Sequence, residues 1–172
     1  MNRIICILGP TASGKTTLAA NLAVLIKGEI ISADSRQVYR GMDLGTGKDL
    51  EDYKIGDAEV PYHLIDIKDP GYEYNVYEFQ NDFIKAFKTI ERNDNIPILC
   101  GGSGMYLDSI IRAYEMTKAT INHEFRNSLE NKSDKELIKL LTEKVPLHNT
   151  SDNSSRERLI RALERANATE DN

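Results

Sequence analysis

A glycine-rich loop between an apolar run and an amphipathic segment constrains this chain more than any other feature. The loop reads Gly9-Pro10-Thr11-Ala12-Ser13-Gly14-Lys15-Thr16 and matches the pattern G-x-x-x-x-G-K-[ST]. The apolar run 3–8 is typical of a buried strand, and apolar residues recur at helical spacing from Leu18 to Ile26. Because the loop lies between a strand and a helix, the sequence predicts a phosphate-binding loop rather than a chance match.

The residue types of this loop suit an anionic group. Its backbone N–H groups and the positive end of the following helix would hold phosphate oxygens. Lys15 would add a positive charge, and the hydroxyl of Thr16 would bind a magnesium ion, so Mg²⁺ is the expected cofactor. The stretch 9–16 is therefore a candidate diphosphate- or nucleotide-binding site.

Strand-like and helix-like segments alternate along the first two thirds of the chain. Further strands are predicted at 29–33, 61–67 and 96–100, and helices at 76–90 and 105–112. This alternation predicts an α/β fold, a P-loop NTPase-like parallel sheet with helices on both faces and a small helical insertion. Because the carboxyl ends of parallel strands share one edge, the loop at 9–16, Asp34 and the glycine turn at 101–104 should face one crevice.

From about residue 117 the pattern changes to short amphipathic helices. Two are predicted at 124–130 and 134–144, with Ser133 as the cap of the second, and a final helix begins near Ser154 or Ser155. The expected organisation has three parts. They are a P-loop α/β core at 1–116, a small helical insertion at 117–150, and a C-terminal helix at 151–172 that returns to the core.

Composition limits the possible partners. A formal net charge of −5 argues against broad electrostatic binding of nucleic acid. No apolar stretch reaches membrane-spanning length, and the first residues enter a strand at once, so we expect a cytoplasmic protein with no membrane contact. Cys6 and Cys100 both lie in apolar runs and are expected to be buried core thiols.

Asp34 directly follows the second predicted strand and should lie in the phosphate crevice. A carboxylate there could bind magnesium. It could also accept a proton from a nucleophile held opposite the phosphate. A third possibility is that it only caps a loop. The residue alone leaves all three open.

The stretch that begins at Asp34, DSRQVYRGMDLGTGK, resembles the signature of the tRNA dimethylallyltransferases. Other matches to this family follow in order along the chain. They are the loop at 9–16, the third strand at 63–66, the glycine-rich turn at 98–106 and the motif RLIRALE at 158–164. The resemblance therefore extends from about Ile4 to Glu164.

The resemblance implies a prenyl transfer reaction. A dimethylallyl group would pass from dimethylallyl diphosphate to the N6 amine of an adenine, in tRNA the adenosine next to the anticodon, with release of diphosphate. The loop at 9–16 would then hold the leaving diphosphate, where Lys15, backbone amides and Mg²⁺ near Thr16 neutralise its charge. By the same resemblance, Asp34 is the general base on the amine.

Ser103 and the three residues that follow Asp34 are expected to lie near the reacting centre or to contact the acceptor. Ser103 stands where these enzymes usually have a threonine whose hydroxyl contacts the reacting centre, and a role as a helix N-cap is equally open. The resemblance assigns Ser35, Arg36 and Gln37 to the substrate nucleotide or its neighbours. Gln37 could read a base edge, and Arg36 could pair with phosphate.

Several arginines in the last third have expected roles. Arg126 resembles an arginine of the family's inserted helical region that contacts substrate, a solvated helix charge being the alternative. Arg158 and Arg161 lie on one helical face and match family arginines near the diphosphate and the RNA. Arg156 and Arg165 have no counterpart and are expected to be solvated.

The identity of the acceptor stays open. The chain ends soon after its R-A-L-E motif, and segment 117–150 is short for the family, which reduces the expected RNA-binding surface. The chain could be a minimal tRNA enzyme, an adenylate dimethylallyltransferase that acts on AMP, ADP or ATP in cytokinin formation, or a shortened chain. The stretch 34–48 favours tRNA, and a monomer is expected. Two other classes are a small-molecule kinase that binds ATP and a catalytically weak binding protein that kept the fold but lost its acceptor site.

Overall fold

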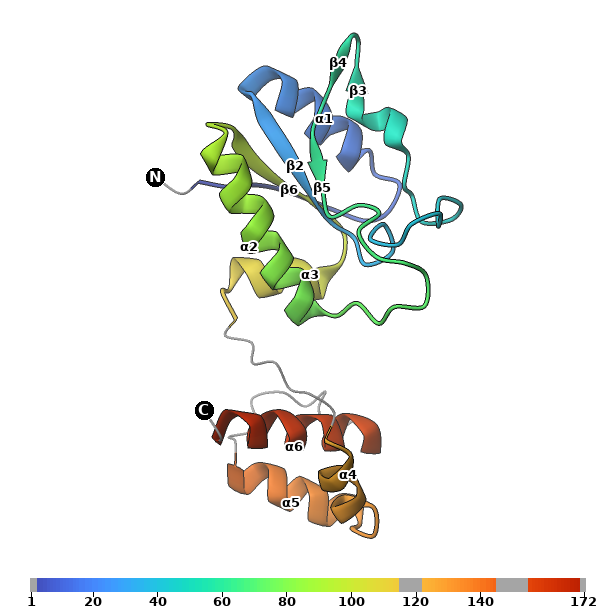
Figure 1. Ribbon diagram of the computed structural model, residues 1–172, viewed down its shortest axis with the longest axis vertical. Helices are drawn as coiled ribbons and strands as arrows, with labels where there is room; N and C mark the ends of the chain where they lie inside the picture. Colours follow the sequence, from blue (N-terminus) through green and yellow to red (C-terminus); the bar gives the residue numbers. More distant parts are fainter. Residues whose placement is uncertain (1–2, 115–121, 145–154, 171–172) are drawn as a thin grey trace. The chain divides into compact units, whose positions relative to one another are not determined.

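The structure, a computed structural model, describes residues 3–114, 122–144 and 155–170 (Figure 1). The chain divides into two compact units, residues 1–114 and 115–172. The second unit contains both the predicted insertion and the predicted C-terminal helix. Return of that helix to the α/β core stays a prediction.

The first unit is built on a parallel sheet. In the described part of the chain this sheet has four strands in the order β1 (Ile5–Leu8), β6 (Ile96–Gly101), β2 (Gly28–Ala33) and β5 (Tyr62–His63). Every neighbouring pair is parallel. Each residue of the central strand β2 is buried, as expected for a strand covered on both faces. The predicted α/β fold with a parallel sheet is confirmed.

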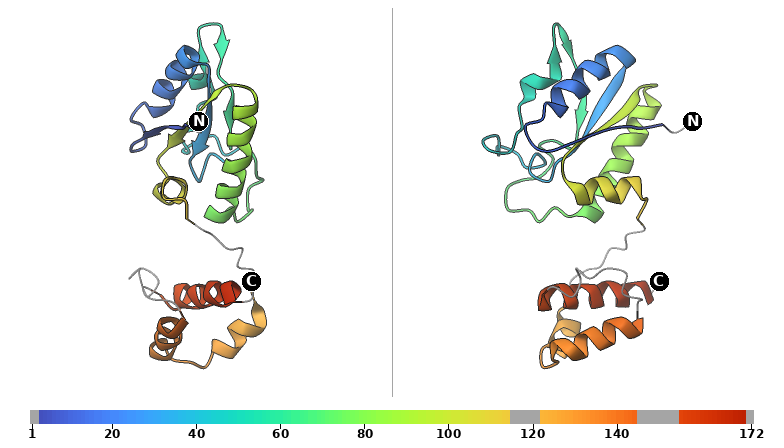
Figure 2. Two further views of the ribbon diagram at one scale, coloured as in Figure 1. Left: turned by 90° about the vertical axis from the view of Figure 1, so that its left-hand side faces the viewer. Right: turned by 180° about the vertical axis from the view of Figure 1, so that it is seen from behind.

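Helices cover both faces of this sheet. They are α1 (Lys15–Ile26), α2 (Val76–Arg92) and α3 (Gly104–Ile111). Figure 2 shows α1 (blue) and α2 (green) on opposite sides of the strands in its left-hand view. Ile30 belongs to the core cluster under α1, whereas Ile31 belongs to the cluster under α2 and α3. Successive residues of β2 therefore serve opposite layers, as the two-residue period of a strand requires.

A small antiparallel hairpin extends from the loop after β2. It consists of β3 (Lys54–Ile55) and β4 (Ala58–Glu59), and the 3₁₀ helix η1 (Leu50–Tyr53) precedes it. Tyr53 is buried and stacks at a tilt on Tyr62 of β5, with ring centroids 4.6 Å apart. This contact fixes the base of the hairpin against the sheet.

The predicted strand at 61–67 is wrong beyond its first residues. β5 ends at His63 because Leu64 and Asp66 have positive φ values of 65° and 53°, which a strand does not contain. The chain turns there to pair with the loop that follows β2. The Asp66 N–H donates to the Gln37 carbonyl at 3.0 Å, so contact with that loop replaces further pairing in the sheet.

The cysteine prediction holds for only one of the two thiols. Cys100 in β6 is buried, as expected, and burial raises its pKa to about 11. Cys6 in β1 is exposed, so its assignment to the core is wrong. The reason is that, among the described residues, β1 pairs with β6 alone and alternates between partly buried and exposed residues.

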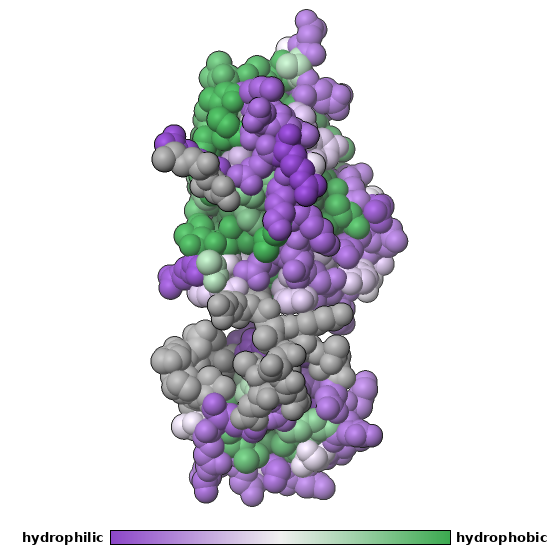
Figure 3. Space-filling model, turned by 60° about the vertical axis from the view of Figure 1, so that its left-hand side comes forward, coloured by the Kyte–Doolittle hydropathy of each residue, from purple (hydrophilic) through white to green (hydrophobic). Residues whose placement is uncertain are grey.

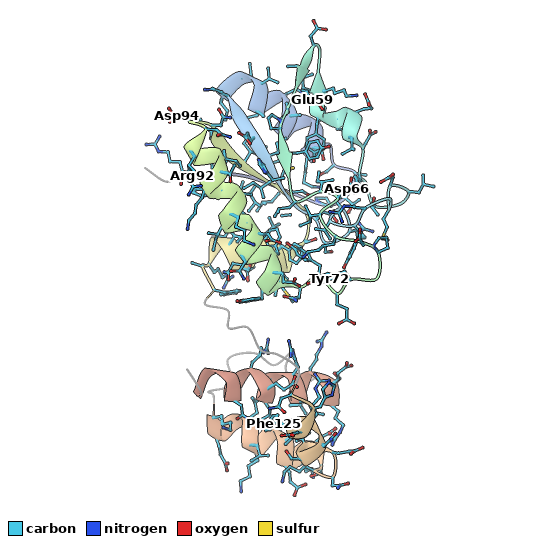
Figure 4. All side chains as sticks on the ribbon, viewed as in Figure 1. Glu59, Asp66, Tyr72, Arg92, Asp94 and Phe125 are labelled. Carbon is cyan, nitrogen blue, oxygen red and sulfur yellow. The ribbon has the colours of Figure 1, made fainter. Side chains whose placement is uncertain are left out.

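The described residues of the second unit form helices α4 (His123–Leu129), α5 (Asp134–Lys144) and α6 (Arg156–Glu170). Leucines from all three helices form its core, and Phe125, labelled in Figure 4, packs against them. Ser133 and Glu136 make the expected cap: Ser133 Oγ accepts the Glu136 N–H at 3.4 Å, and Glu136 Oε2 accepts the Ser133 N–H at 2.7 Å. The predicted helices and this cap are confirmed.

The surface of the first unit carries hydrophobic side chains, which are green on the face drawn in Figure 3. Large exposed hydrophobic residues of this unit include Leu18, Leu25, Leu44, Met105 and Ile111.

Within residues 3–114, 122–144 and 155–170, no helix is long and apolar enough to cross a membrane.

Candidate active site

The glycine loop connects β1 to α1 at the carboxyl edge of the sheet. Gly14 immediately precedes α1 with a φ of 75°, in the left-handed region that favours glycine. A glycine in this position supplies no side-chain cap, so the first N–H groups of α1 are not covered by one. These donors and the positive end of the helix lie where the sequence predicts an anion site, and anion binding there stays a prediction.

Lys15 is folded back onto its own loop. Its Nζ donates to the Pro10 carbonyl and lies 3.4 Å from Ser13 Oγ, which itself donates to the Pro10 carbonyl at 2.8 Å. A carbonyl is a weaker partner for an ammonium group than a charged phosphate oxygen. An anionic ligand in the loop would therefore attract the lysine away from Pro10.

The donor set around Thr16 fits magnesium. The neighbouring Thr17 donates from Oγ1 to Asp52 Oδ1 at 3.2 Å, which brings a carboxylate to the first turn of α1. In the part of the chain that the structure describes, no three His, Cys, Asp or Glu side chains gather as a metal site. Magnesium commonly binds through few protein oxygens together with substrate phosphates and water, so the Thr16 hydroxyl at the end of the glycine loop suits it.

Strand register brings the three expected loops together. Leu8 aligns with Gly101, and Gly101 aligns with Ala33, so β1, β6 and β2 end at one level. A Cβ on Gly101 would lie only 2.3 Å from the Ala33 carbonyl oxygen, and one on Gly102 would lie 3.1 Å from that of Gly9. The glycine turn therefore allows close backbone approach on both sides. The predicted convergence on one edge is confirmed.

Asp34 lies at this junction. Ser35, the next residue, donates its N–H to Ser103 Oγ at 3.0 Å. Asp34 Oδ1 accepts the Arg36 N–H at 2.9 Å, and the Asp34 side chain is 19% exposed. The carboxylate is thus anchored through one oxygen and still reachable from solvent.

Ser103 stands at the N-cap position of α3, but its hydroxyl makes no cap hydrogen bond. The hydroxyl instead accepts the Ser35 N–H and lies 3.4 Å from Ser35 Oγ. The predicted N-cap position is therefore confirmed, but without a side-chain cap bond. The hydroxyl joins the end of β6 to the residue after Asp34.

Gln37 is directed into the protein. Its Oε1 accepts from Ser32 Oγ at 2.9 Å, its Nε2 donates to the Gly47 carbonyl at 3.0 Å, and the residue is 9% exposed. One end of the amide is therefore bonded to β2 and the other to the loop that follows it. Reading of a base edge by Gln37 stays a prediction, and it requires these bonds to exchange.

Lys48 is a residue of this region whose role the sequence did not reveal. Its side chain is 1% exposed, and its Nζ contacts Asp43 at 2.7 Å, the Tyr39 carbonyl at 2.9 Å and Asp66 (labelled in Figure 4). Burial opposes the charged form, but the bonds from both aspartates outweigh it and raise the pKa of Lys48. This buried cation holds the loop that follows Asp34 in place. The sequence shows the lysine but not which carboxylates it meets.

In the second unit, Arg126 and Arg161 meet at Glu164. Arg126 donates from Nε to Oε1 at 2.7 Å and from Nη2 to Oε2 at 2.9 Å, and Arg161 Nη1 reaches Oε2 at 3.1 Å. Hydrogen bonds from Arg126, opposed by burial and assisted by Arg161, lower the pKa of Glu164 to about 2. The alternative of a solvated charge at Arg126 is therefore wrong. Contact of these arginines with substrate stays a prediction.

Arg156 is also paired within the unit rather than solvated, contrary to expectation. Its Nη2 donates to the carbonyls of Leu129 and Glu130 at 3.0 and 2.8 Å, and its Nη1 donates to the Lys132 carbonyl and Asp134 at 2.8 Å each. The last carbonyls of a helix lack partners within it, and this guanidinium donates to those at the end of α4 together with the Lys132 N–H, which reaches the Leu129 carbonyl at 3.1 Å. The side chains of Arg158 and Arg165 are exposed.

The fold and this junction define a class: a P-loop-like α/β protein with an aspartate and a serine beside its phosphate loop. The family model for IPP transferase matches residues 37–172. The chain belongs to the IPP transferase family.

Relatives of known name support this placement. A tRNA dimethylallyltransferase 2 of Bacteroides fragilis is 55% identical over 161 residues, which are 94% of this chain and 53% of the relative. One from Phocaeicola vulgatus is 56% identical and covers 94% and 52% of the two chains. The chain spans about half the length of the curated relatives it matches.

Solved structures give the same result. The crystal structure of the full-length tRNA isopentenylpyrophosphate transferase from Bacillus halodurans matches with a TM-score of 0.64 and 35% identity, over 98% of this chain and 56% of that one. A eukaryotic dimethylallyltransferase acting on tRNA matches with a TM-score of 0.70 and 25% identity, over 99% and 44%.

Proposed function

We propose that the protein transfers a dimethylallyl group from dimethylallyl diphosphate to the N6 amine of the adenosine next to the anticodon of tRNA, releasing diphosphate. The observation that carries this proposal is the junction of Asp34 and Ser103 beside the phosphate loop, at one edge of the sheet. The names of the relatives support the donor and favour tRNA over a free adenine nucleotide.

The phosphate loop would hold the leaving group. As the allylic C–O bond breaks, its electron pair leaves with the diphosphate. The N–H groups at the start of α1 and the ammonium of Lys15 would stabilise the charge that develops there. Thr16 would help to hold Mg²⁺, which would supply further positive charge to the diphosphate.

Asp34 would act as the general base. The N6 nitrogen forms the new bond to the allylic carbon, and one of its protons passes to the carboxylate. Because Oδ1 already accepts the Arg36 N–H, Oδ2 is the oxygen available for this proton. Ser103 would keep the loop in register through Ser35 and contact the reacting centre with its hydroxyl.

The remaining partners are part of the same proposal. Ser35 and Arg36 would contact the acceptor nucleotide. Arg126, Arg158 and Arg161 would contact phosphate groups of the substrates. The protein would act as a monomer in the cytoplasm.

The test is to supply labelled dimethylallyl diphosphate and Mg²⁺ with an anticodon stem-loop RNA, with AMP, or with no acceptor. Label transfer to the RNA supports the proposal. Transfer to AMP alone would replace tRNA with a free nucleotide as the acceptor. Binding of the donor without label transfer to the RNA or to AMP would indicate a binding protein that does not catalyse the reaction. Phosphate transfer from labelled ATP in a parallel reaction would indicate a kinase.

A further inference from the structure

Glu164 is a buried carboxylate to which the proposed reaction assigns no role. Its side chain is 1% exposed, and both of its oxygens are saturated. Oε1 accepts the Asn122 N–H at 3.2 Å and Arg126 Nε at 2.7 Å. Oε2 accepts Arg126 Nη2 and Arg161 Nη1 at 2.9 and 3.1 Å. One carboxylate therefore fixes two guanidinium groups that lie 35 residues apart in the sequence.

The two arginines stay accessible above this carboxylate. The side chain of Arg126 is 33% exposed and that of Arg161 is 42% exposed. Both guanidinium groups therefore keep part of their surface open to a ligand while Glu164 holds them. Because Arg126 donates from Nε and Nη2, its Nη1 donors are directed away from Glu164.

Resting on the proposed function, we infer that Glu164 is a positioning residue that holds Arg126 and Arg161 as one fixed clamp for a phosphate of the RNA acceptor. Long arginine side chains lose conformational freedom when they bind a ligand, and ordering them beforehand reduces that loss. A planar guanidinium held by a two-point bond also presents its remaining donors in a fixed direction.

A count of charges alone predicts the opposite effect of removing the Glu164 charge. The direction in which RNA affinity changes therefore distinguishes the two explanations. Removal of a negative charge next to two arginines should strengthen binding of a polyanion. Removal of a positioning residue should weaken it, although the protein becomes more positive. Glu164→Gln keeps the size of the side chain and deletes only the charge and its acceptor strength.

The experiment measures binding of a fluorescent anticodon stem-loop RNA to the full chain at fixed low salt. The variants are Glu164→Gln, Arg126→Lys, the double variant, and Glu124→Gln, which removes an exposed charge from α4 as a matched control. We expect Glu164→Gln and Arg126→Lys each to weaken binding by about fivefold to tenfold. The double variant should bind RNA no more weakly than Arg126→Lys does, because both changes act on the same clamp. Glu124→Gln should bind as the parent does.

Circular dichroism separates positioning from folding. If Glu164→Gln loses helical signal, the test rests on RNA binding by Arg126→Lys. Lysine keeps the positive charge but cannot make the two-point bond of the guanidinium to Glu164. Weaker binding with intact helices supports the clamp, and parental binding overturns it. RNA binding by Glu164→Gln that equals or exceeds that of the parent overturns the inference alone. If the parent protein binds no RNA, both the inference and the proposed acceptor fail, whereas transfer to AMP would still show the donor half of the reaction.

Discussion

The N–H of Ser35 donates to Ser103 Oγ at 3.0 Å, which joins the carboxyl ends of the two central strands directly beside Asp34. The position of the carboxylate therefore depends on a residue 69 positions away in the sequence. A threonine at position 103 would offer the same hydroxyl, so the bond needs the oxygen and not the rest of the side chain.

We predict that Ser103→Ala slows dimethylallyl transfer by about tenfold, because the lost hydrogen bond releases the loop that carries the base. Ser103→Thr should keep the parental rate within about twofold, since its hydroxyl is retained. Steady-state kinetics with the RNA acceptor tests both variants. Parental activity in Ser103→Ala would show that the Ser35 bond has no part in the reaction.

Lys48→Met should destabilise the first unit by about 2 kcal/mol, because it leaves Asp43 and Asp66 without their shared cation. The urea midpoint, followed by tyrosine fluorescence, measures this change. Lys54→Met is the control, since its ion pair with Glu51 is exposed and should contribute little. Equal midpoints for the two variants would contradict a structural role for the buried cation.

The second unit should lose stability in acid through Glu164. Hydrogen bonds from Arg126, against the opposing effect of burial, lower its pKa in the folded state from an ordinary 4.5 to about 2. A carboxyl with a depressed pKa contributes stability that is fully present above its unfolded pKa and lost as pH falls toward the folded one. The contribution should therefore disappear between about pH 4.5 and pH 2. Thermal unfolding followed by helical signal should show a smaller pH slope in this window for Glu164→Gln. An unchanged slope would contradict the ion pair.

Arg156→Ala should destabilise the second unit by about 1–3 kcal/mol, because it removes the guanidinium that donates to the Glu130 and Lys132 carbonyls and to Asp134. Lys139→Ala removes an exposed charge from α5 and serves as the control. Urea unfolding followed at 222 nm compares the two. A solvated Arg156 would instead give the same midpoint as the control.

The phosphate loop and its neighbours could be predicted because they depend on local order. A strand, a glycine loop and a helix specify Gly14 and Lys15 without knowledge of the rest of the fold. Parallel strands place their carboxyl ends together, so Asp34 and the turn at 101–104 follow from topology alone.

The contacts that organise the site could not be predicted in the same way. Lys48 contacts Asp66, which lies in a turn. Positive φ values in that turn end the strand that the apolar pattern predicts. Arg126 meets Glu164 across 38 residues, and one sequence does not identify which distant carboxylate an arginine will find. Exposure of Cys6 depends on its strand lying at the sheet edge, which the apolar run itself does not indicate.

The role of Asp34 is tested most directly by single-turnover transfer of labelled dimethylallyl to the anticodon stem-loop RNA by Asp34→Asn. Asparagine keeps the shape of the side chain but cannot accept the N6 proton, so the rate should fall by between about 100-fold and 10,000-fold. Asp57→Asn, an exposed change in the hairpin, should transfer at the parental rate. Transfer by Asp34→Asn at the parental rate would contradict the assignment of Asp34 as the base.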